Sequence, residues 1–349
     1  MLISLDTLKR QHRLTAMGAH LPNSSGSSHG RTASSRRQAI AVVMEAPERL
    51  ELREIGLPPP GDDELVVDIE WSGISTGTER LLWYGRMPSF PGMGYPLVPG
   101  YESVGRVSAA GSDSAARVGE RVFVAGARCF GEVRGLFGGA AERLVVPADK
   151  AIAIDERLGE RGVLMALAAT AFHVTSRPGA CHPDLIVGHG VLGRLLARIA
   201  LAAGAPVPVV WESNPARRDG AMGYDVIDPA SDDRRDYRVV CDVSGDGGIL
   251  DTLLGRLAPG GEIVLAGFYS DRLGFDFPVA FMREARLRVA AEWRPHDLAA
   301  VKAMAEDGRL SLDGLITHRH AAREAEQAYR TAFGDPACLK MIIDWRERS

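Results

Sequence analysis

The sequence predicts an α/β protein in which a small β-barrel is followed by a doubly wound parallel sheet. Residues 39–160 contain many short apolar runs separated by Gly and Pro turns, which is typical of a small barrel. From about residue 161, apolar strands alternate with helical patterns, as in a parallel sheet. The glycine-rich stretch GHGVLG, residues 188–193, lies between one such strand and one such helix.

Length and composition agree with a two-domain globular enzyme that acts on small molecules. The chain has 349 residues, of which 46% are hydrophobic and 25% charged. With 41 Lys and Arg against 45 Asp and Glu, the net charge is −4, so we expect no binding of nucleic acid. No apolar run is long enough to span a membrane, and no leader peptide is recognisable.

Cysteine usage indicates a reducing location, and we predict a cytoplasmic protein. Cys129, Cys181, Cys241 and Cys338 lie far apart and form no CxxC pair. This spacing argues against both a disulfide framework and a structural zinc site.

The elements follow from the local patterns in chain order. Residues 1–38 are rich in Ser, Gly and Arg, and we predict that this extension is disordered. Residues 39–55, AIAVVMEAPERLELREI, predict a hairpin, and further short strands follow. Residues 161–176 have helical spacing, DLIV predicts a buried strand before GHGVLG, and a second strand ends at Glu212.

Two domains follow from this order. We predict a catalytic domain over 39–163 that is completed by 311–349, because the last segment ends in a strand that can return to the barrel. Residues 164–310 are expected to form a dinucleotide-binding domain.

GHGVLG has the context of a dinucleotide-binding turn, with a strand before it, a helix after it and an acid about twenty residues on. Gly188 permits the tight turn, Gly190 lets the backbone approach a pyrophosphate, and Gly193 allows close helix packing. Glu212 is expected to accept from ribose hydroxyls and to repel a 2′-phosphate, which favours NAD over NADP. The predicted cofactor-binding residues are Gly188, Gly190, Val191, Leu192, Gly193, Glu212, Ser244, Gly267 and Phe268.

Two histidines near these motifs are interpreted as non-catalytic. His189 lies inside the glycine turn, which works through its backbone, so its side chain is expected to flank the phosphates or face solvent. His173 lies in a helical pattern and is expected to be a packed histidine or to lie between the domains.

The motifs GISTGTE, VPGYESVGRV, GHGVLG, DVSG and GGEIVLAGF, in this order, resemble the medium-chain dehydrogenase/reductase superfamily over residues 39–349. The resemblance implies a GroES-like barrel and a Rossmann domain. In zinc-dependent members a Cys stands at the position of Ser75, His-Glu at Tyr101-Glu102, and a third ligand near Ala166. Only Glu102 remains here, so we expect no catalytic metal.

Longer stretches are similar to the bacteriochlorophyllide a dehydrogenase family of bacteriochlorophyll biosynthesis. They are WSGISTGTERLLWYGRMPSFPGMGYPLVPGYESVGRV, GARCFGEVRGLFGGAAERLVVPA and DLIVGHGVLGRLLARIA. The resemblance implies NAD-dependent oxidation of the 3-(1-hydroxyethyl) group of a magnesium bacteriochlorin to 3-acetyl. The N-terminal extension lies outside it.

Without a metal, the chemistry needs alignment of the carbinol with the nicotinamide and a proton acceptor or relay. The predicted catalytic residues are Tyr101, Glu102, Ser75 and Thr78, with Glu102 orienting Tyr101 or a water. The alternative is that Ser75 and Tyr101 only fill the vacated metal site.

An aromatic, Pro/Gly-rich loop is the candidate pocket for a flat apolar ligand. Its residues are Trp83, Tyr84, Met87, Phe90, Met93 and Tyr95. Alternatively, these residues cover the interdomain cleft or form a dimer contact. The sequence is also compatible with peripheral membrane association and with a homodimer.

Two other functions compete with this one. One is a zinc-free NAD(P)H quinone or enone reductase, against which Glu212 counts. The other is a non-catalytic tetrapyrrole-binding carrier, which tight NADH binding without turnover would indicate.

Overall fold

The computed structural model describes residues 37–176, 179, 181–270 and 272–347. The predicted disordered extension, residues 1–38, lies outside the described residues except for its last two positions. Among the described residues, no helix combines the length and the apolar character needed to cross a bilayer.

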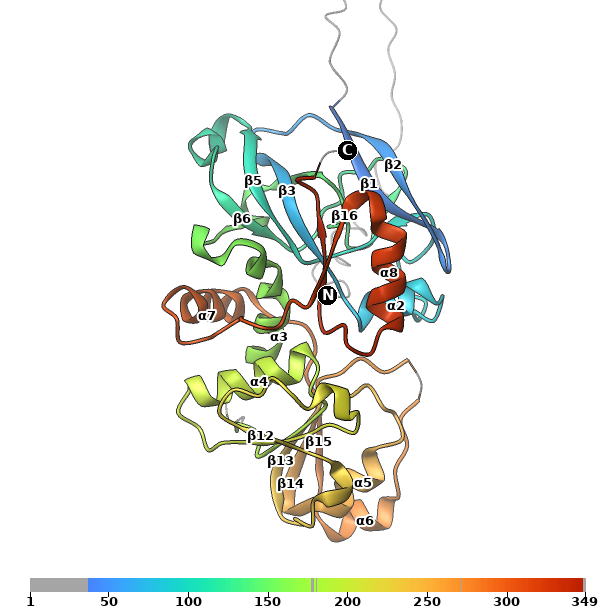
Figure 1. The fold of residues 1–349 in the computed structure, drawn as a ribbon, viewed down its shortest axis with the longest axis vertical. Coiled ribbons are helices and arrows are strands. Elements are labelled where there is room, and N and C mark those ends of the chain that lie inside the picture. The colour runs from blue at the N-terminus through green and yellow to red at the C-terminus, as the bar shows by residue number, and fades with distance from the viewer. Residues whose placement is uncertain (1–36, 177–178, 180, 271, 348–349) are drawn as a thin grey trace, which may run out of the picture. The chain divides into compact units, whose positions relative to one another are not determined.

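Within the described ranges, strands from the first part of the chain and from its end form two sheets, of four and seven strands (Figure 1). The hairpin predicted at 39–55 is confirmed, because its two strands pair antiparallel. The strands of the four-stranded sheet, in spatial order, are β2 (Arg49–Leu57), β1 (Arg37–Ala46), β4 (Leu97–Val98) and β7 (Arg134–Gly135). The strands of the seven-stranded sheet are β16 (His318–Ala321), β17 (Met341–Asp344), β3 (Glu64–Ile74), β5 (Ser103–Ala110), β6 (Arg121–Val124) and β9 (Ala151–Ala153), with β8 (Arg143–Pro147) beside β3.

The end of the chain joins this seven-stranded sheet. Strand β17 pairs antiparallel with β3, with Met341 opposite Ile74 and Asp344 opposite Trp71. The last strand therefore returns to the N-terminal sheets, while the exact domain limits stay predictions.

The middle of the chain forms the expected parallel sheet, with β10 at the point where the strand order reverses. All neighbouring pairs of this sheet run parallel. Its strands, in spatial order, are β12 (Asp225–Ile227), β11 (Val209–Trp211), β10 (Leu185–Val187), β13 (Tyr237–Asp242), β14 (Leu257–Leu265) and β15 (Arg286–Val289).

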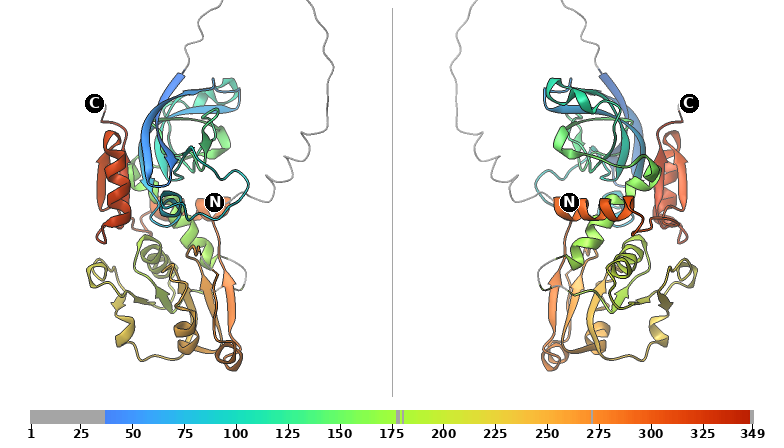
Figure 2. Two further views of the ribbon diagram at one scale, coloured as in Figure 1. Left: turned by 90° about the vertical axis from the view of Figure 1, so that its right-hand side faces the viewer. Right: turned by 90° about the vertical axis from the view of Figure 1, so that its left-hand side faces the viewer.

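Helices connect and cover the sheets (Figures 1 and 2). They are α2 (Thr78–Trp83), α3 (Met165–Thr175), α4 (Val191–Ala202), α5 (Leu250–Arg256), α6 (Phe277–Met282), α7 (Pro295–Glu306) and α8 (Ala325–Gly334). Short 3₁₀ turns are η1 (Ser112–Arg117), η2 (Ala148–Lys150), η3 (Glu156–Leu164), η4 (Pro215–Arg217), η5 (Pro229–Ser231) and η6 (Ala322–Glu324). Helix α8 lies against β2, β16 and β17.

Strand alternation explains why β10 reads as a continuous apolar run. Ile186 belongs to the core that includes α3 and α4, whereas Leu185 and Val187 belong to the core that includes α5. Successive side chains of a strand point to opposite faces, so a strand covered on both faces needs apolar residues throughout.

Candidate functional site

The glycine turn after β10 has the shape that close approach of a ligand requires. Gly188 has φ +104°, a left-handed conformation that favours glycine. A Cβ at Gly193 would lie 1.9 Å from the Gly188 carbonyl oxygen, so only glycine allows the helix to pack this closely. A Cβ at Gly190 would meet nothing within 4 Å. The turn thus leaves open space over Gly190 at the start of α4.

Glu212 stands beside this turn, at the carboxyl edge of the parallel sheet. Its two carboxylate oxygens accept hydrogen bonds from the backbone N–H of His189 at 3.1 Å and of Asn214 at 2.8 Å. The carboxylate is held between the glycine turn and the loop after β11, and its contact with a ribose stays a prediction.

The structure corrects the interpretation of His189. Its ring is buried, and its Nδ1 lies 2.7 Å from the Arg217 carbonyl oxygen while Nε2 lies 2.9 Å from the Tyr224 hydroxyl. Because a carbonyl only accepts, Nδ1 donates and Nε2 accepts. Burial lowers the pKa of His189 to about 4, so the ring is neutral at pH 7. The expectation that the His189 ring faces solvent was wrong, because the ring packs against the Arg217 backbone and Tyr224, whereas the alternative that it flanks phosphates stays a prediction.

Arg194, which directly follows GHGVLG, fixes the same loop and was missed in the sequence. Its buried guanidinium donates to the carbonyl oxygens of His189 at 3.1 Å, Arg217 at 3.1 Å, Asp219 at 2.7 Å and Gly220 at 3.2 Å. The only available signal was its position just after the motif. One side chain therefore holds the loop by three hydrogen bonds and the glycine turn by a fourth.

Two arginines that follow Glu212 in the sequence, Arg217 and Arg218, are both engaged. Arg218 donates to Asp228 at 2.5 Å and to the Glu212 carbonyl oxygen at 2.8 Å. Arg217 donates through Nε to the Pro336 carbonyl oxygen at 2.7 Å. Neither guanidinium is left without a partner near Glu212.

Ser244 and Gly267 lie at the ends of the next two strands and meet at Asp242. The Ser244 N–H and hydroxyl both donate to Asp242, at 2.9 Å and 2.7 Å, and the Tyr269 hydroxyl donates at 2.7 Å. Burial raises the pKa of Asp242. A Cβ at Gly267 would lie 3.3 Å from the Tyr269 hydroxyl. The Asp242 carboxylate, which holds Ser244, was not among the residues predicted from the sequence.

The other predicted cofactor residues differ in exposure. Val191 is buried in the core, Leu192 is half-buried, and Phe268 is exposed at the edge of the sheet. His173, in α3, is buried with Nδ1 2.8 Å from Asp297 at the start of α7, as expected of a packed histidine.

In the barrel, Ser75 and Tyr101 meet directly. Their hydroxyl oxygens lie 2.7 Å apart, and the Thr78 N–H donates to the Ser75 hydroxyl at 3.3 Å. The Tyr101 ring lies edge-on against Phe137 with a centroid distance of 5.3 Å. Burial, together with the negative charge of Glu102, raises the pKa of Tyr101 above its ordinary value. Tyr101 is thus a neutral phenol in a hydroxyl pair.

Glu102 does not share this pair, although it follows Tyr101 in sequence. Glu102 is 0% exposed, and its Oε2 lies 2.7 Å from the Nζ of Lys340, which is 1% exposed. Lys340 also donates to the Ile74 carbonyl oxygen at 3.1 Å. The Oε1 of Glu102 has no hydrogen-bond partner among the described residues. A Cβ at Gly73 would lie 2.2 Å from Oε2, so a larger residue there would have to displace the Glu102 carboxylate.

A second buried carboxyl, Glu79, lies beneath Ser75. It accepts from the Ser75 backbone N–H at 3.0 Å and from the Tyr329 hydroxyl, on α8, at 2.6 Å. Burial raises the pKa of Glu79 to about 7. Neither Glu79 nor Lys340 was singled out from the sequence, because their partners lie 250 and 238 residues away in the chain.

The six aromatic and methionine residues of the loop divide into two groups. Trp83 and Met87 are buried in the hydrophobic core, and Trp83 stacks on Tyr329 at 6.1 Å. Tyr84 is 36% exposed. Phe90, Met93 and Tyr95 are half-buried. Only the second group offers surface to a ligand.

The three positions that hold a catalytic zinc in related enzymes do not suit the ion here. Two present the hydroxyls of Ser75 and Tyr101, and Ala166 is fully buried in α3. Zinc in proteins is bound by thiolate, imidazole or carboxylate. Within the described ranges, no group of three or more His, Cys, Asp or Glu side chains is arranged to hold a metal.

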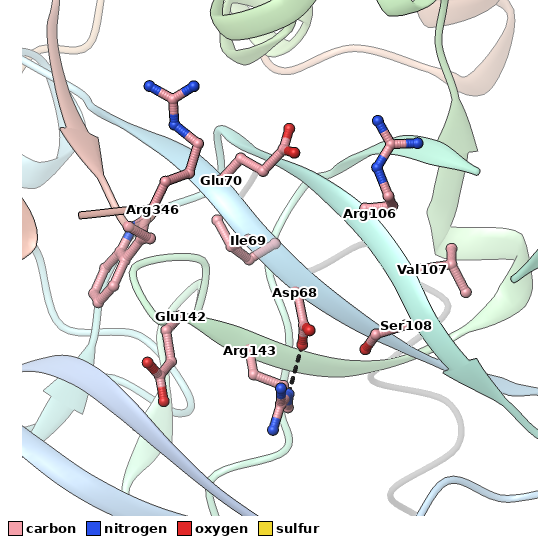
Figure 3. A pocket seen from close by; sticks show the side chains of 10 residues that line it. Asp68, Ile69, Glu70, Arg106, Val107, Ser108, Glu142, Arg143 and Arg346 are labelled. Atoms are coloured by element: carbon pink, nitrogen blue, oxygen red, sulfur yellow. Dashed lines mark hydrogen bonds and ion pairs between the residues drawn. The ribbon is translucent and has the colours of Figure 1, made fainter. Parts of the chain in front are cut away.

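A shallow depression on the barrel is a different feature (Figure 3). Two of its arginines are already paired: Arg143 with Asp68 at 2.6 Å, as Figure 3 shows, and Arg106 with Glu156 at 2.9 Å. It is lined by Asp68, Ile69, Glu70, Arg106, Val107, Ser108, Glu142, Arg143, Trp345 and Arg346. Since it contains none of the candidate site residues, we do not assign it a role in catalysis.

Comparisons with known proteins agree with this architecture. Residues 61–156 match the alcohol dehydrogenase GroES-like domain. Two solved structures share the fold and cover 88% of this chain and 99% of theirs. One is a short chain alcohol dehydrogenase from E. coli CFT073 complexed with NADH, with TM-score 0.76 and 22% identity. The other is a dehydrogenase from Sinorhizobium meliloti 1021 bound to NADP, with TM-score 0.74 and 23% identity. The predicted fold class is confirmed.

Two relatives are much more similar in sequence. The 2-desacetyl-2-hydroxyethyl bacteriochlorophyllide A dehydrogenase of Rhodobacter capsulatus is 58% identical over 88% of this chain and 98% of its own length. The protein of the same name from Cereibacter sphaeroides is 57% identical over 88% and 99%. The chain therefore belongs to the 2-desacetyl-2-hydroxyethyl bacteriochlorophyllide A dehydrogenase family, within the medium-chain dehydrogenases/reductases.

Proposed function

We propose that this protein oxidises the hydroxyethyl group of a bacteriochlorophyllide, or of a chlorophyllide, to an acetyl group. This group is numbered 2 in the relatives' name and 3 in the ring numbering used above. The observation that carries the proposal is the 58% identity over 98% of the Rhodobacter capsulatus relative. The substrate is then a magnesium bacteriochlorin, and the enzyme is a dehydrogenase acting on a CH–OH group.

The test is direct. The purified protein is incubated with NAD and 3-(1-hydroxyethyl) bacteriochlorophyllide while the visible spectrum is recorded. We expect the long-wavelength band to move to the red, because the new carbonyl extends the conjugated system. Tight NADH binding with no spectral change would indicate a carrier, and reduction of quinones with NADPH would indicate the reductase alternative.

For the cofactor we propose NAD. Two observations support this: the open space over Gly190 leaves room for a pyrophosphate, and a carboxylate at Glu212, beside the glycine turn, would repel a 2′-phosphate. Arg218, which would otherwise attract such a phosphate, is paired with Asp228, and Arg217 donates through Nε to the Pro336 carbonyl oxygen. We further propose that Ser244, Gly267 and Phe268, at the edge of the same sheet, line the cofactor site together with Val191 and Leu192 of the α4 first turn.

The ratio of kcat/KM with NAD and with NADP tests this choice. The Glu212→Ala variant should erode the preference for NAD by about 1 to 3 kcal/mol, the scale of a hydrogen bond to a charged group. Because Glu212 also braces the glycine turn, Glu212→Gln serves as the control: it keeps the side chain's size and should mainly improve the use of NADP. Equal wild-type turnover with both cofactors would refute the proposal.

NAD, when bound, would supply the hydride acceptor for the carbinol carbon, and the protein's own residues have to manage the hydroxyl proton. We propose Tyr101, Ser75 and Thr78 as a proton relay. Since the pKa of Tyr101 is raised, its phenolate is disfavoured. Tyr101 therefore accepts the carbinol proton only as it donates its own to the hydroxyl of Ser75 or of Thr78, which releases a proton to water. Thr78 is half-exposed, which opens the relay to water. Glu102 does not hydrogen-bond to Tyr101; in this proposal it supports the relay indirectly, through its buried ion pair with Lys340.

We propose that no catalytic zinc takes part. The donors at Ser75 and Tyr101 and the methyl group of Ala166 do not suit the ion, and no step is assigned to it. In this substrate the carbinol carbon is attached to a conjugated macrocycle, which spreads the positive charge that builds as hydride leaves. Elemental analysis should find substoichiometric zinc, and chelators should leave activity unchanged. Stoichiometric zinc whose removal abolishes activity, and whose return restores it, would contradict this.

We also propose a homodimer formed through the edge of the parallel sheet. Strand β15 is the outer strand, and beside it Phe281 and Met282 are 66% and 76% exposed. A two-fold related copy would continue the sheet and cover these side chains. The surface is formed by Phe275, Phe277, Ala280, Phe281, Met282, Glu284, Ala285 and Leu287. The four free cysteines support the cytoplasm as its location, and peripheral membrane association stays a prediction.

A further inference from the structure

The segment between the two buried carboxyls of the site is cationic and aromatic, although the protein as a whole is acidic. From Arg80 to Tyr101 the sequence contains two arginines and no Asp or Glu, in a chain of net charge −4. The same segment holds the partly exposed rings of Tyr84, Phe90 and Tyr95. A surface of this kind suits a ligand with a flat apolar body and a negative group at its edge.

Both arginines lie against one exposed ring. The guanidinium carbon of Arg80 is 6.0 Å from the centroid of the Tyr84 ring, and that of Arg86 is 5.9 Å from it. Both guanidiniums are on exposed residues. Within the described ranges, neither forms an ion pair with a carboxylate. Two like charges near one ring repel each other, so an anion placed there would be bound favourably.

A neighbouring arginine shows the contrasting arrangement. Arg330, on α8, lies 5.7 Å from the ring of the buried Trp83, and its NH2 is 2.7 Å from Glu326. Its charge is already compensated by an acid of the same helix. The arginines beside Tyr84 differ from it in lacking such a partner among the described residues.

The position of this cluster relative to the relay is set by α2. The helix begins at Thr78, which contacts Ser75, and Tyr84 directly follows its last residue. At about 1.5 Å of rise per residue, Tyr84 lies about 9 Å along the axis from Thr78. This span is comparable with the width of a tetrapyrrole macrocycle.

We propose that Arg80 and Arg86 form the subsite for the substrate's carboxylate. The inference rests on the proposed function: a bacteriochlorophyllide is the unesterified pigment and carries a free propionate on the macrocycle, away from the hydroxyethyl group. Arginine is well suited to a carboxylate because its planar guanidinium donates two parallel hydrogen bonds. Tyr84 between the two charges supports the apolar edge of the ring. The cluster would hold the macrocycle in place while the hydroxyethyl group reaches Tyr101.

The experiment compares the free acid of the 3-(1-hydroxyethyl) substrate with its methyl ester, in the wild type and in the double variant Arg80→Gln/Arg86→Gln. For the free acid, KM should rise about 10- to 100-fold in the variant, the range expected when hydrogen bonds to a charged group are lost. The value of kcat should stay within about twofold, and KM for the ester should be the same in both proteins. Arg80→Lys/Arg86→Lys should restore part of the affinity, and Arg330→Gln is the matched control with no change.

Binding of the free acid is also followed by its absorption change without NAD, so that the two proposals are tested separately. Arginine-dependent binding without turnover would support the subsite and sink the proposed function. Turnover with the same acid-to-ester ratio in wild type and double variant would overturn the subsite alone. Equal losses on acid and ester would likewise overturn it, because they would show a packing effect. Absence of both binding and turnover would overturn both proposals.

Discussion

The buried carboxyl of Glu79 should give the protein a stability that falls as pH rises toward neutrality. Burial raises its pKa in the folded state from the ordinary value of 4.5 to about 7. Between these two values the folded protein binds more protons than the unfolded chain, so the free energy of unfolding decreases with increasing pH. The stabilisation is complete below pH 4.5 and is lost as pH approaches 7.

The magnitude follows from the size of the shift. A gap of about 2.5 pH units, at about 1.4 kcal/mol for each unit, amounts to about 3 kcal/mol. The hydrogen bonds from Ser75 and Tyr329 favour the ionised form and reduce the shift, but they are outweighed by burial. A conservative replacement, Glu79→Gln, keeps an acceptor oxygen and removes the titration.

The assay is equilibrium urea unfolding of wild type and Glu79→Gln at several pH values from 4.5 to 8. The difference between their free energies of unfolding should fall by about 3 kcal/mol between pH 4.5 and 7 and then become constant. Glu326→Gln, an exposed carboxyl on the same helix as Tyr329, is the control and should show no comparable slope. Parallel curves for wild type and Glu79→Gln across this range would refute the reasoning.

Three further predictions concern the pair, the relay and the sheet edge. Lys340→Met should destabilise the protein by about 3 to 5 kcal/mol in denaturant unfolding, because it leaves Glu102 charged and buried. The double variant Lys340→Met/Glu102→Leu should recover most of this stability. Equal losses of stability in the single and double variants would contradict the prediction. Tyr101→Phe should lower turnover about 10²- to 10⁴-fold with NAD binding preserved. A loss under about tenfold, with deuterium at the carbinol carbon slowing both proteins alike, would remove Tyr101 from the mechanism. Phe281→Glu should convert a dimer to a monomer in sedimentation, and a monomeric wild type would count against the proposed interface.

Local pattern was enough to predict the fold class. The hairpin at 39–55, the parallel sheet and the strand–turn–helix around GHGVLG depend on strand alternation, helical spacing and glycine geometry, all of which act over a few residues. A Cβ at Gly193 would make contacts that are too short, so this position requires glycine, and the motif that contains it can be recognised from the sequence. The family also follows from the sequence, because long motifs from both halves of the chain match those of its relatives.

Only the tertiary structure decided which polar groups share the buried space behind Tyr101. The sequence places Glu102 next to Tyr101, yet backbone direction sends its carboxylate to Lys340, 238 residues away, while Ser75 meets the Tyr101 hydroxyl. The fold likewise places the ring of His189 beneath the loop that Arg194 holds. A buried charge or hydrogen-bonding group must find a partner wherever the fold brings one, and that choice depends on packing between distant segments rather than on spacing along the chain.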